Sequence, residues 1–90
     1  MKTTETPKAN PCIGLREDFE DWAVLFDPNT TNAVGINPVG VAIWKKLDGA
    51  HNLNALVAEV RATFCDVPDT VDDEVSAFVD SLAQKGFVAI

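Results

Sequence analysis

The side chains that most often carry out chemistry are sparse in this chain of 90 residues. His51 is its single histidine, and its two cysteines, Cys12 and Cys65, lie far apart in the sequence. A metal site needs several ligands at characteristic spacings, and a nucleophilic cysteine needs a neighbouring base or a positive field. Because neither pattern surrounds these residues, we predict no catalytic residue, no metal site and no cofactor. We expect His51 to be a solvated turn residue and the cysteines to be free thiols that fill small apolar spaces.

The charge balance of the chain is acidic, with 14 Asp and Glu residues against 7 Lys and Arg residues. A surface of this sign repels the nucleic-acid backbone, so we expect no nucleic-acid partner. No apolar run approaches the length of a membrane span, and the N-terminus lacks the apolar core of a signal peptide. We therefore expect a cytoplasmic protein without a membrane partner. The chain has the length of one domain, in which polar residues 1–10 form a disordered tail and residues 11–90 fold.

The first half of the folded part predicts three short strands, over residues 13–17, 22–26 and 32–36. The middle strand has apolar residues on both faces, which is typical of a central strand. A turn signal, Asp27-Pro28-Asn29-Thr30, separates it from the third strand. In the third strand, Gly35 would permit the close approach of another backbone. Short turns between the strands predict an antiparallel meander.

The second half predicts three helices. The first begins after the N-cap Asn37 with Pro38 at its first position, and Gly49 ends it. The second begins near Asn52. A capping box of Thr70 and Asp73 is expected to start the third, which Gly86 stops before an apolar tail that packs back on the core. The predicted fold class is α+β, a three-stranded antiparallel meander followed by three helices.

Four segments, in their order, resemble the PqqD family of winged-helix-like domains. They are the strand and turn Val24-Leu25-Phe26-Asp27-Pro28, the helix start Asn37-x-x-Gly40-x-x-Ile43-Trp44, the stop Leu47-Asp48-Gly49, and the ending Phe78-x-x-x-Leu82-x-x-x-Gly86-Phe87-Val88. The resemblance covers residues 13–90. The start at Asn10-Pro11 and the runs over residues 22–28 and 37–40 resemble the subgroup found in SynChlorMet peptide-modification cassettes.

This resemblance implies a non-catalytic chaperone that binds the leader segment of a ribosomally made precursor peptide. The chaperone presents this peptide to a modifying enzyme, commonly a radical S-adenosylmethionine (SAM) protein. In the family the leader adds as an extra strand to the third strand and lies against the third helix. One departure concerns the turn pattern Pro-x-Thr-Gly, because Thr31 stands where the family has glycine. The left-handed conformation would then fall on Asn29 or Asn32.

The implied peptide-binding residues lie on these two elements. They are Asn32, Ala33, Val34, Gly35 and Ile36 on the third strand, and Val75, Phe78, Val79, Leu82 and Asp80 on the third helix. Some of the four apolar helix residues must face the core, and the pattern does not separate them. The helix dipole favours acidic residues in the first turn, and Asp80 lies beyond that turn. We therefore interpret Asp80 as part of a charged rim that selects a basic leader.

Two other functions are compatible with the same pattern. A protein–protein adaptor of similar fold would dock an enzyme without holding a leader, and a winged-helix regulator would bind DNA. The acidic third helix argues against DNA, because a recognition helix carries positive charge.

Overall fold

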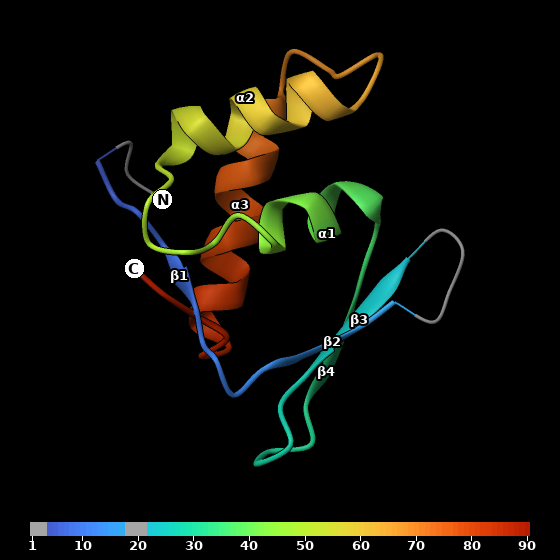
Figure 1. Ribbon diagram of the computed structural model, residues 1–90, viewed down its shortest axis with the longest axis vertical. Coiled ribbons are helices and arrows are strands. Elements are labelled where there is room, and N and C mark those ends of the chain that lie inside the picture. Colours follow the sequence, from blue (N-terminus) through green and yellow to red (C-terminus); the bar gives the residue numbers. More distant parts are fainter. Residues whose placement is uncertain (1–3, 18–21) are drawn as a thin grey trace.

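The computed structural model describes residues 4–17 and 22–90 of the chain. A sheet lies to one side of three helices, and a separate pair of short strands joins the two ends of the described chain (Figure 1). The elements, in chain order, are β1 (Lys8–Ala9), β2 (Gly14–Arg16), β3 (Ala23–Phe26), β4 (Ala33–Ile36), α1 (Pro38–Trp44), α2 (Leu53–Thr63), α3 (Val71–Gln84) and β5 (Val88–Ala89).

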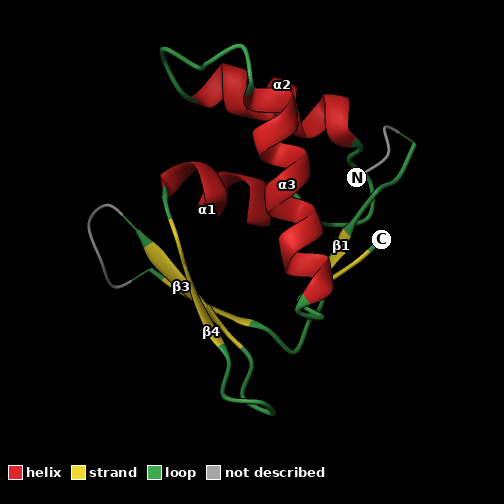
Figure 2. Cartoon of the chain, turned by 180° about the vertical axis from the view of Figure 1, so that it is seen from behind, coloured by secondary structure: helices red, strands yellow, loops and turns green. Residues whose placement is uncertain are grey.

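The main sheet is the predicted antiparallel meander, in the order β2-β3-β4. Its central strand β3 pairs Leu25 with Leu15 on one side and with Val34 on the other. Ala23 and Leu25 are almost fully buried beneath the helices, whereas Trp22 at the other face is 47% exposed. The helices stack over one face of this sheet, with α1 nearest to it (Figure 2). The predicted α+β class is thus confirmed.

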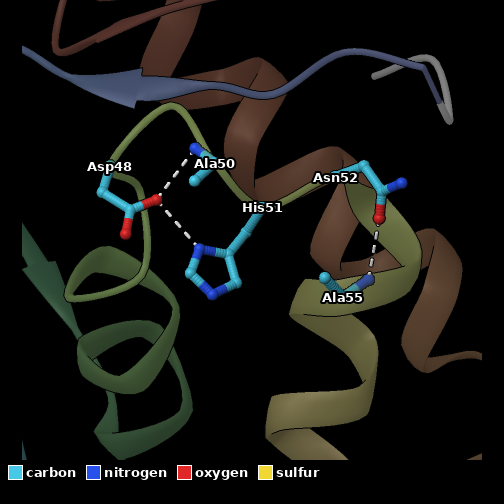
Figure 3. Close-up of polar contacts among 5 residues, drawn as sticks. All are labelled: Asp48, Ala50, His51, Asn52 and Ala55. Atoms are coloured by element: carbon cyan, nitrogen blue, oxygen red, sulfur yellow. Dashed lines mark hydrogen bonds and ion pairs between the residues drawn. The ribbon is translucent and has the colours of Figure 1, made fainter.

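Two asparagines begin helices as predicted. The Asn37 side chain accepts a hydrogen bond from the backbone N–H of Gly40 (2.8 Å), with Pro38 at the first helical position. Asn52 accepts one from the N–H of Ala55 (2.9 Å; Figure 3). These bonds satisfy N–H groups that the helix itself leaves unpaired. Helix α1 ends at Trp44, earlier than predicted, and Gly49 lies in the following turn with a φ of 83°.

Three local predictions were wrong. Thr70 precedes α3 but its side chain makes no capping hydrogen bond, because its backbone is not in the extended conformation that aims a capping oxygen at the helix. Thr31 itself has a φ of 61°, so the left-handed conformation falls neither on Asn29 nor on Asn32. Both cysteines are free, but they are exposed and do not fill the interior.

The N-terminal segment was expected to be disordered through Asn10, yet residues 7–10 are ordered in the structure. β1 pairs with β5, Pro7 is fully buried, and the N–H of Ala9 donates to the carbonyl of Leu47 (2.7 Å). The N–H of Asn10 donates to the carbonyl of Phe87 (2.8 Å). A two-residue strand has no periodicity of its own, and its partners are remote in sequence, so the pattern could not predict it. Residues 1–3 lie outside the described part.

The three described helices pack around one apolar core. Their apolar sides form one cluster with the inner face of the sheet, and Phe87 of the C-terminal tail is fully buried in it, as predicted. None of the helices within residues 4–17 and 22–90 has the length and apolar character that crossing a bilayer requires.

Candidate functional site

The edge of β4 is the first component of the site. β4 pairs with β3, and no described strand pairs with its other side. The N–H of Asp27 donates to the carbonyl of Asn32 (2.9 Å), and hydrogen-bonded pairs alternate along an antiparallel ladder. Given the pairing of Leu25 with Val34, the backbone groups of Val34 are therefore directed at β3. Those of Ala33 and Gly35 are directed at the open edge.

The five predicted strand residues thus divide into two sets. Val34 and Ile36 direct their backbone groups at β3, and the carbonyl of Asn32 accepts from Asp27, whereas Ala33 and Gly35 offer theirs to an added strand. Burial differs along the strand, since Ile36 is buried, Val34 is half-buried, and Asn32, Ala33 and Gly35 are exposed. A strand added here would gain backbone hydrogen bonds from two residues of β4 and would lie beside the helices.

A cleft of about 230 Å³ between the start of α1 and the first two turns of α3 is the second component. It adjoins the end of β4, because Asn37 lines it and follows Ile36 directly. Its lining residues are Asn37, Val39, Gly40, Ile43, Val71, Glu74, Val75 and Phe78. Most are apolar, so the cleft can hold an apolar side chain.

The floor of this cleft depends on a glycine in α1. A side chain at Gly40 would begin 3.0 Å from Cβ of Ile36 and 3.3 Å from Cζ of Phe78. These distances are shorter than ordinary carbon–carbon contacts of about 3.5–4.0 Å. Gly40 therefore lets α1 approach both β4 and α3.

The predicted peptide-binding residues of α3 lie in the core, in the cleft, or on the side of the helix opposite the cleft. Val75, Val79 and Leu82 are at most 1% exposed and belong to the core. Phe78 is half-buried and lines the cleft, which Val75 also reaches. Asp80 is half-buried, and nine residues after Val71 it is on the opposite side of a helix with about 3.6 residues per turn. It does not line the cleft.

The sequence reasoning left two cleft residues of α3 out of the site. Val71 and Glu74 stand at the i, i+3, i+4, i+7 spacing that also contains Val75 and Phe78, and all four line the cleft. That spacing was the signal that could have included them. Glu74 is exposed and is the one charged residue of the lining, so the cleft combines apolar walls with an acidic rim.

The residues considered for chemistry form no cluster. Among residues 4–17 and 22–90, no group of three or more His, Cys, Asp or Glu residues could hold a metal ion. His51 Nδ1 lies 2.9 Å from Oδ1 of Asp48, which also accepts a hydrogen bond from the N–H of Ala50 (Figure 3). The hydrogen bond from His51 and then that from Ala50 lower the pKa of Asp48 from its ordinary value. His51 is therefore part of a polar turn between α1 and α2.

Comparisons with known proteins agree with this architecture. The family model for coenzyme PQQ synthesis protein D (PqqD) matches residues 23–88. The structure of TbiB1 in complex with the TbiA(beta) leader peptide is similar, with 23% identity over 90% of this chain and 93% of that chain and a TM-score of 0.72. A heterocyclase in complex with substrate and cofactor is also similar, at 17% identity and a TM-score of 0.64. The match covers 96% of this chain and 11% of the heterocyclase chain. The comparison with curated proteins found no match.

Proposed function

This chain belongs to the PqqD family, and from that premise and the open edge of β4 we propose that it binds the leader segment of a ribosomally made precursor peptide. The leader adds as a strand beside β4, and one of its apolar side chains enters the cleft between α1 and α3. The protein is a non-catalytic, cytoplasmic chaperone that presents the precursor to a modifying enzyme. The family resemblance indicates a radical SAM enzyme as this partner.

The observation that carries the proposal is the direction of the backbone groups of Ala33 and Gly35. Peptides that bind by strand addition gain affinity from main-chain hydrogen bonds and specificity from pockets for alternate side chains. Both requirements meet here, because the unpaired edge of β4 runs into the apolar cleft. The TbiB1 structure supports the proposal, since a chain of similar fold was solved there with a leader peptide.

The proposal is tested by two proline substitutions in β4. We expect Ala33→Pro to weaken binding about 5- to 10-fold, since it removes one edge donor and a net hydrogen bond contributes about 1 kcal/mol. The fold should persist, because proline is tolerated where an edge N–H faces solvent. Val34→Pro instead removes a donor within the sheet and should destabilise the protein itself by about 1–3 kcal/mol, the cost of leaving its partner carbonyl unsatisfied.

The test uses synthetic peptides that cover the N-terminal segments of candidate precursors, chosen from short reading frames in the gene neighbourhood. Their affinity is measured by calorimetry, and backbone amides are followed by NMR during the titration. Shifts concentrated at residues 33–37 and along the cleft side of α3 are expected. Equal affinity of Ala33→Pro and the unaltered protein, or shifts confined to β2 and α2, would exclude strand addition and favour an enzyme-docking adaptor.

A further inference from the structure

The solvent-facing side of the main sheet carries two aromatic residues, each lying over a glycine of a neighbouring strand. A side chain at Gly35 would begin 3.1 Å from Cζ3 and 3.2 Å from Cε3 of Trp22, so the indole ring covers this residue of β4. The ring of Phe26 covers Gly14 of β2 in the same manner. Trp22 thus lies towards the β4 edge of the sheet, and Phe26 lies towards the β2 edge.

The Trp22 ring is placed where an added strand would meet it. Gly35 pairs with Val24 of β3, so the indole reaches Gly35 diagonally, from β3 to the edge strand. Residues directly opposite one another on adjacent strands have Cβ atoms about 4.5–5.5 Å apart. An added residue opposite Gly35 would direct its side chain to the same face, beside a ring that begins about 3 Å from the Gly35 position.

We propose that Trp22 is a specificity-determining residue that packs against an aliphatic side chain of the bound leader, at the leader position opposite Gly35. The inference rests on the proposed function and deepens it. The ring atoms nearest Gly35 are carbons, and Trp22 is 47% exposed, so an aliphatic neighbour would remove apolar surface from water.

This placement defines a class of leader sequence. Successive residues of a strand point to opposite faces of the sheet. The residue opposite Gly35 therefore contacts Trp22, and an adjacent residue points towards the helices and the cleft. The structure assigns this protein to leaders with two adjacent apolar residues, one held on each face of the extended sheet.

Gly35 has a specific part in this arrangement. A Cβ at this position would push the indole away by a few tenths of an ångström, because the available distance is shorter than an ordinary carbon contact. The glycine therefore leaves the ring in position for a ligand side chain.

The test compares Trp22→Ala with Phe26→Ala, using the same synthetic leader segment as above. Phe26→Ala is the matched control, because it removes the equivalent aromatic ring from the far edge of the same face. We expect Trp22→Ala to weaken binding about 5- to 10-fold, the effect of losing an aromatic contact of about 1 kcal/mol. Phe26→Ala should change affinity by less than about twofold, and Trp22→Phe should restore most of the loss.

A double-mutant cycle makes the test independent of folding effects. The leader residue with NMR contacts to Gly35 is changed to Ala and measured against the unaltered protein and Trp22→Ala. The two losses should not add, because both changes remove one contact. Additive losses, or equal losses in Trp22→Ala and Phe26→Ala, would overturn the role of Trp22. If Ala33→Pro still weakened binding in that case, the proposed function would stand. Unchanged binding by Ala33→Pro would exclude strand addition at β4, and the role of Trp22 with it.

Discussion

At the scale of single residues, the turn between β3 and β4 contains the clearest conflict between side chain and backbone. Thr31 has a φ of 61°, a conformation in which β-branched residues are rare. Its N–H donates to the carbonyl of Asp27 (2.8 Å), and this bond holds the turn closed. The family pattern that the sequence resembles has glycine at this position, and glycine adopts a positive φ without a steric cost.

We therefore expect Thr31→Gly to stabilise the protein by about 0.5–1 kcal/mol. The left-handed conformation costs an L-residue about 1–2 kcal/mol, and the greater freedom of glycine in the unfolded chain offsets part of the gain. Chemical denaturation measures the change. Thr30→Gly is the control, because Thr30 does not have a positive φ and should lose stability. Equal effects of the two changes would contradict the explanation.

A second residue-scale prediction concerns acid. The hydrogen bonds from His51 and Ala50 lower the pKa of Asp48 below 3.8, so the unfolded chain binds this proton more readily than the folded one. The resulting stabilisation is complete above about pH 3.8 and is lost as the pH falls through the lowered pKa. Asp48→Asn should therefore flatten the fall in melting temperature between pH 5 and pH 2, as calorimetry would show. If the melting temperature of Asp48→Asn fell with pH as steeply as that of the unaltered protein, Asp48 would not contribute to the acid dependence of stability.

At the scale of elements, α3 presents two acidic surfaces with different surroundings. Glu74 lines the cleft, whereas Asp80 lies on the opposite side of the helix. The sequence alone favoured Asp80 as the residue that selects a basic leader, because its charge was the one that the helix dipole did not explain. The structure places Glu74 in the lining of the cleft, which adjoins the end of β4 through Asn37.

We expect Glu74→Gln to weaken binding of a leader that carries Lys or Arg by up to about 1 kcal/mol, as is usual for an exposed charge pair. Asp80→Asn should have a smaller effect. The difference should shrink as salt increases, because rim charges act through screened fields. Calorimetry at two salt concentrations measures both variants. A larger loss from Asp80→Asn would restore the first interpretation of α3.

The elements also differ in how much of their structure local sequence patterns could predict. The N-cap Asn37, the start of α2 near Asn52 and the central position of β3 were predicted correctly, because each has a local chemical cause. The direction of the backbone groups of Val34 required the register with Leu25, which no local pattern contains. The core role of Val79 was equally hidden, because the same apolar stripe of a helix can face a core or a groove.

At the scale of the whole molecule, the N-terminal segment connects parts that the main sheet does not reach. β1 pairs with β5, and the backbone of Pro7 and Ala9 also forms hydrogen bonds with the turn that follows α1 (Figure 1). The N–H of Gly49 donates to the carbonyl of Pro7 (3.1 Å), and the N–H of Ala9 donates to that of Leu47. This segment therefore stabilises the helical half of the molecule and lies away from the candidate site.

Deletion of residues 1–9 should lower the free energy of unfolding by about 2–4 kcal/mol, from lost backbone hydrogen bonds at about 1 kcal/mol each and the exposure of apolar surface under Pro7. Leader affinity should change little at temperatures where the shortened protein is folded. Denaturation and calorimetry measure the two effects. Lys8→Ala keeps the backbone and is the control. A shortened chain as stable as the full one would contradict a structural role for β1.

The pairing of β1 with β5 also constrains the order of folding. Lys8 is synthesised 81 positions before its partner Ala89 (89 − 8). Closing so long a loop has the largest entropic cost of any strand pairing in this molecule, and contacts between remote residues form slowly. On the ribosome, the β3–β4 hairpin can form before β5 has been synthesised and can pair with β1. The unpaired edge of β4 can thus exist before the helical half is fully stable, so an extended segment of another chain can pair with it during synthesis.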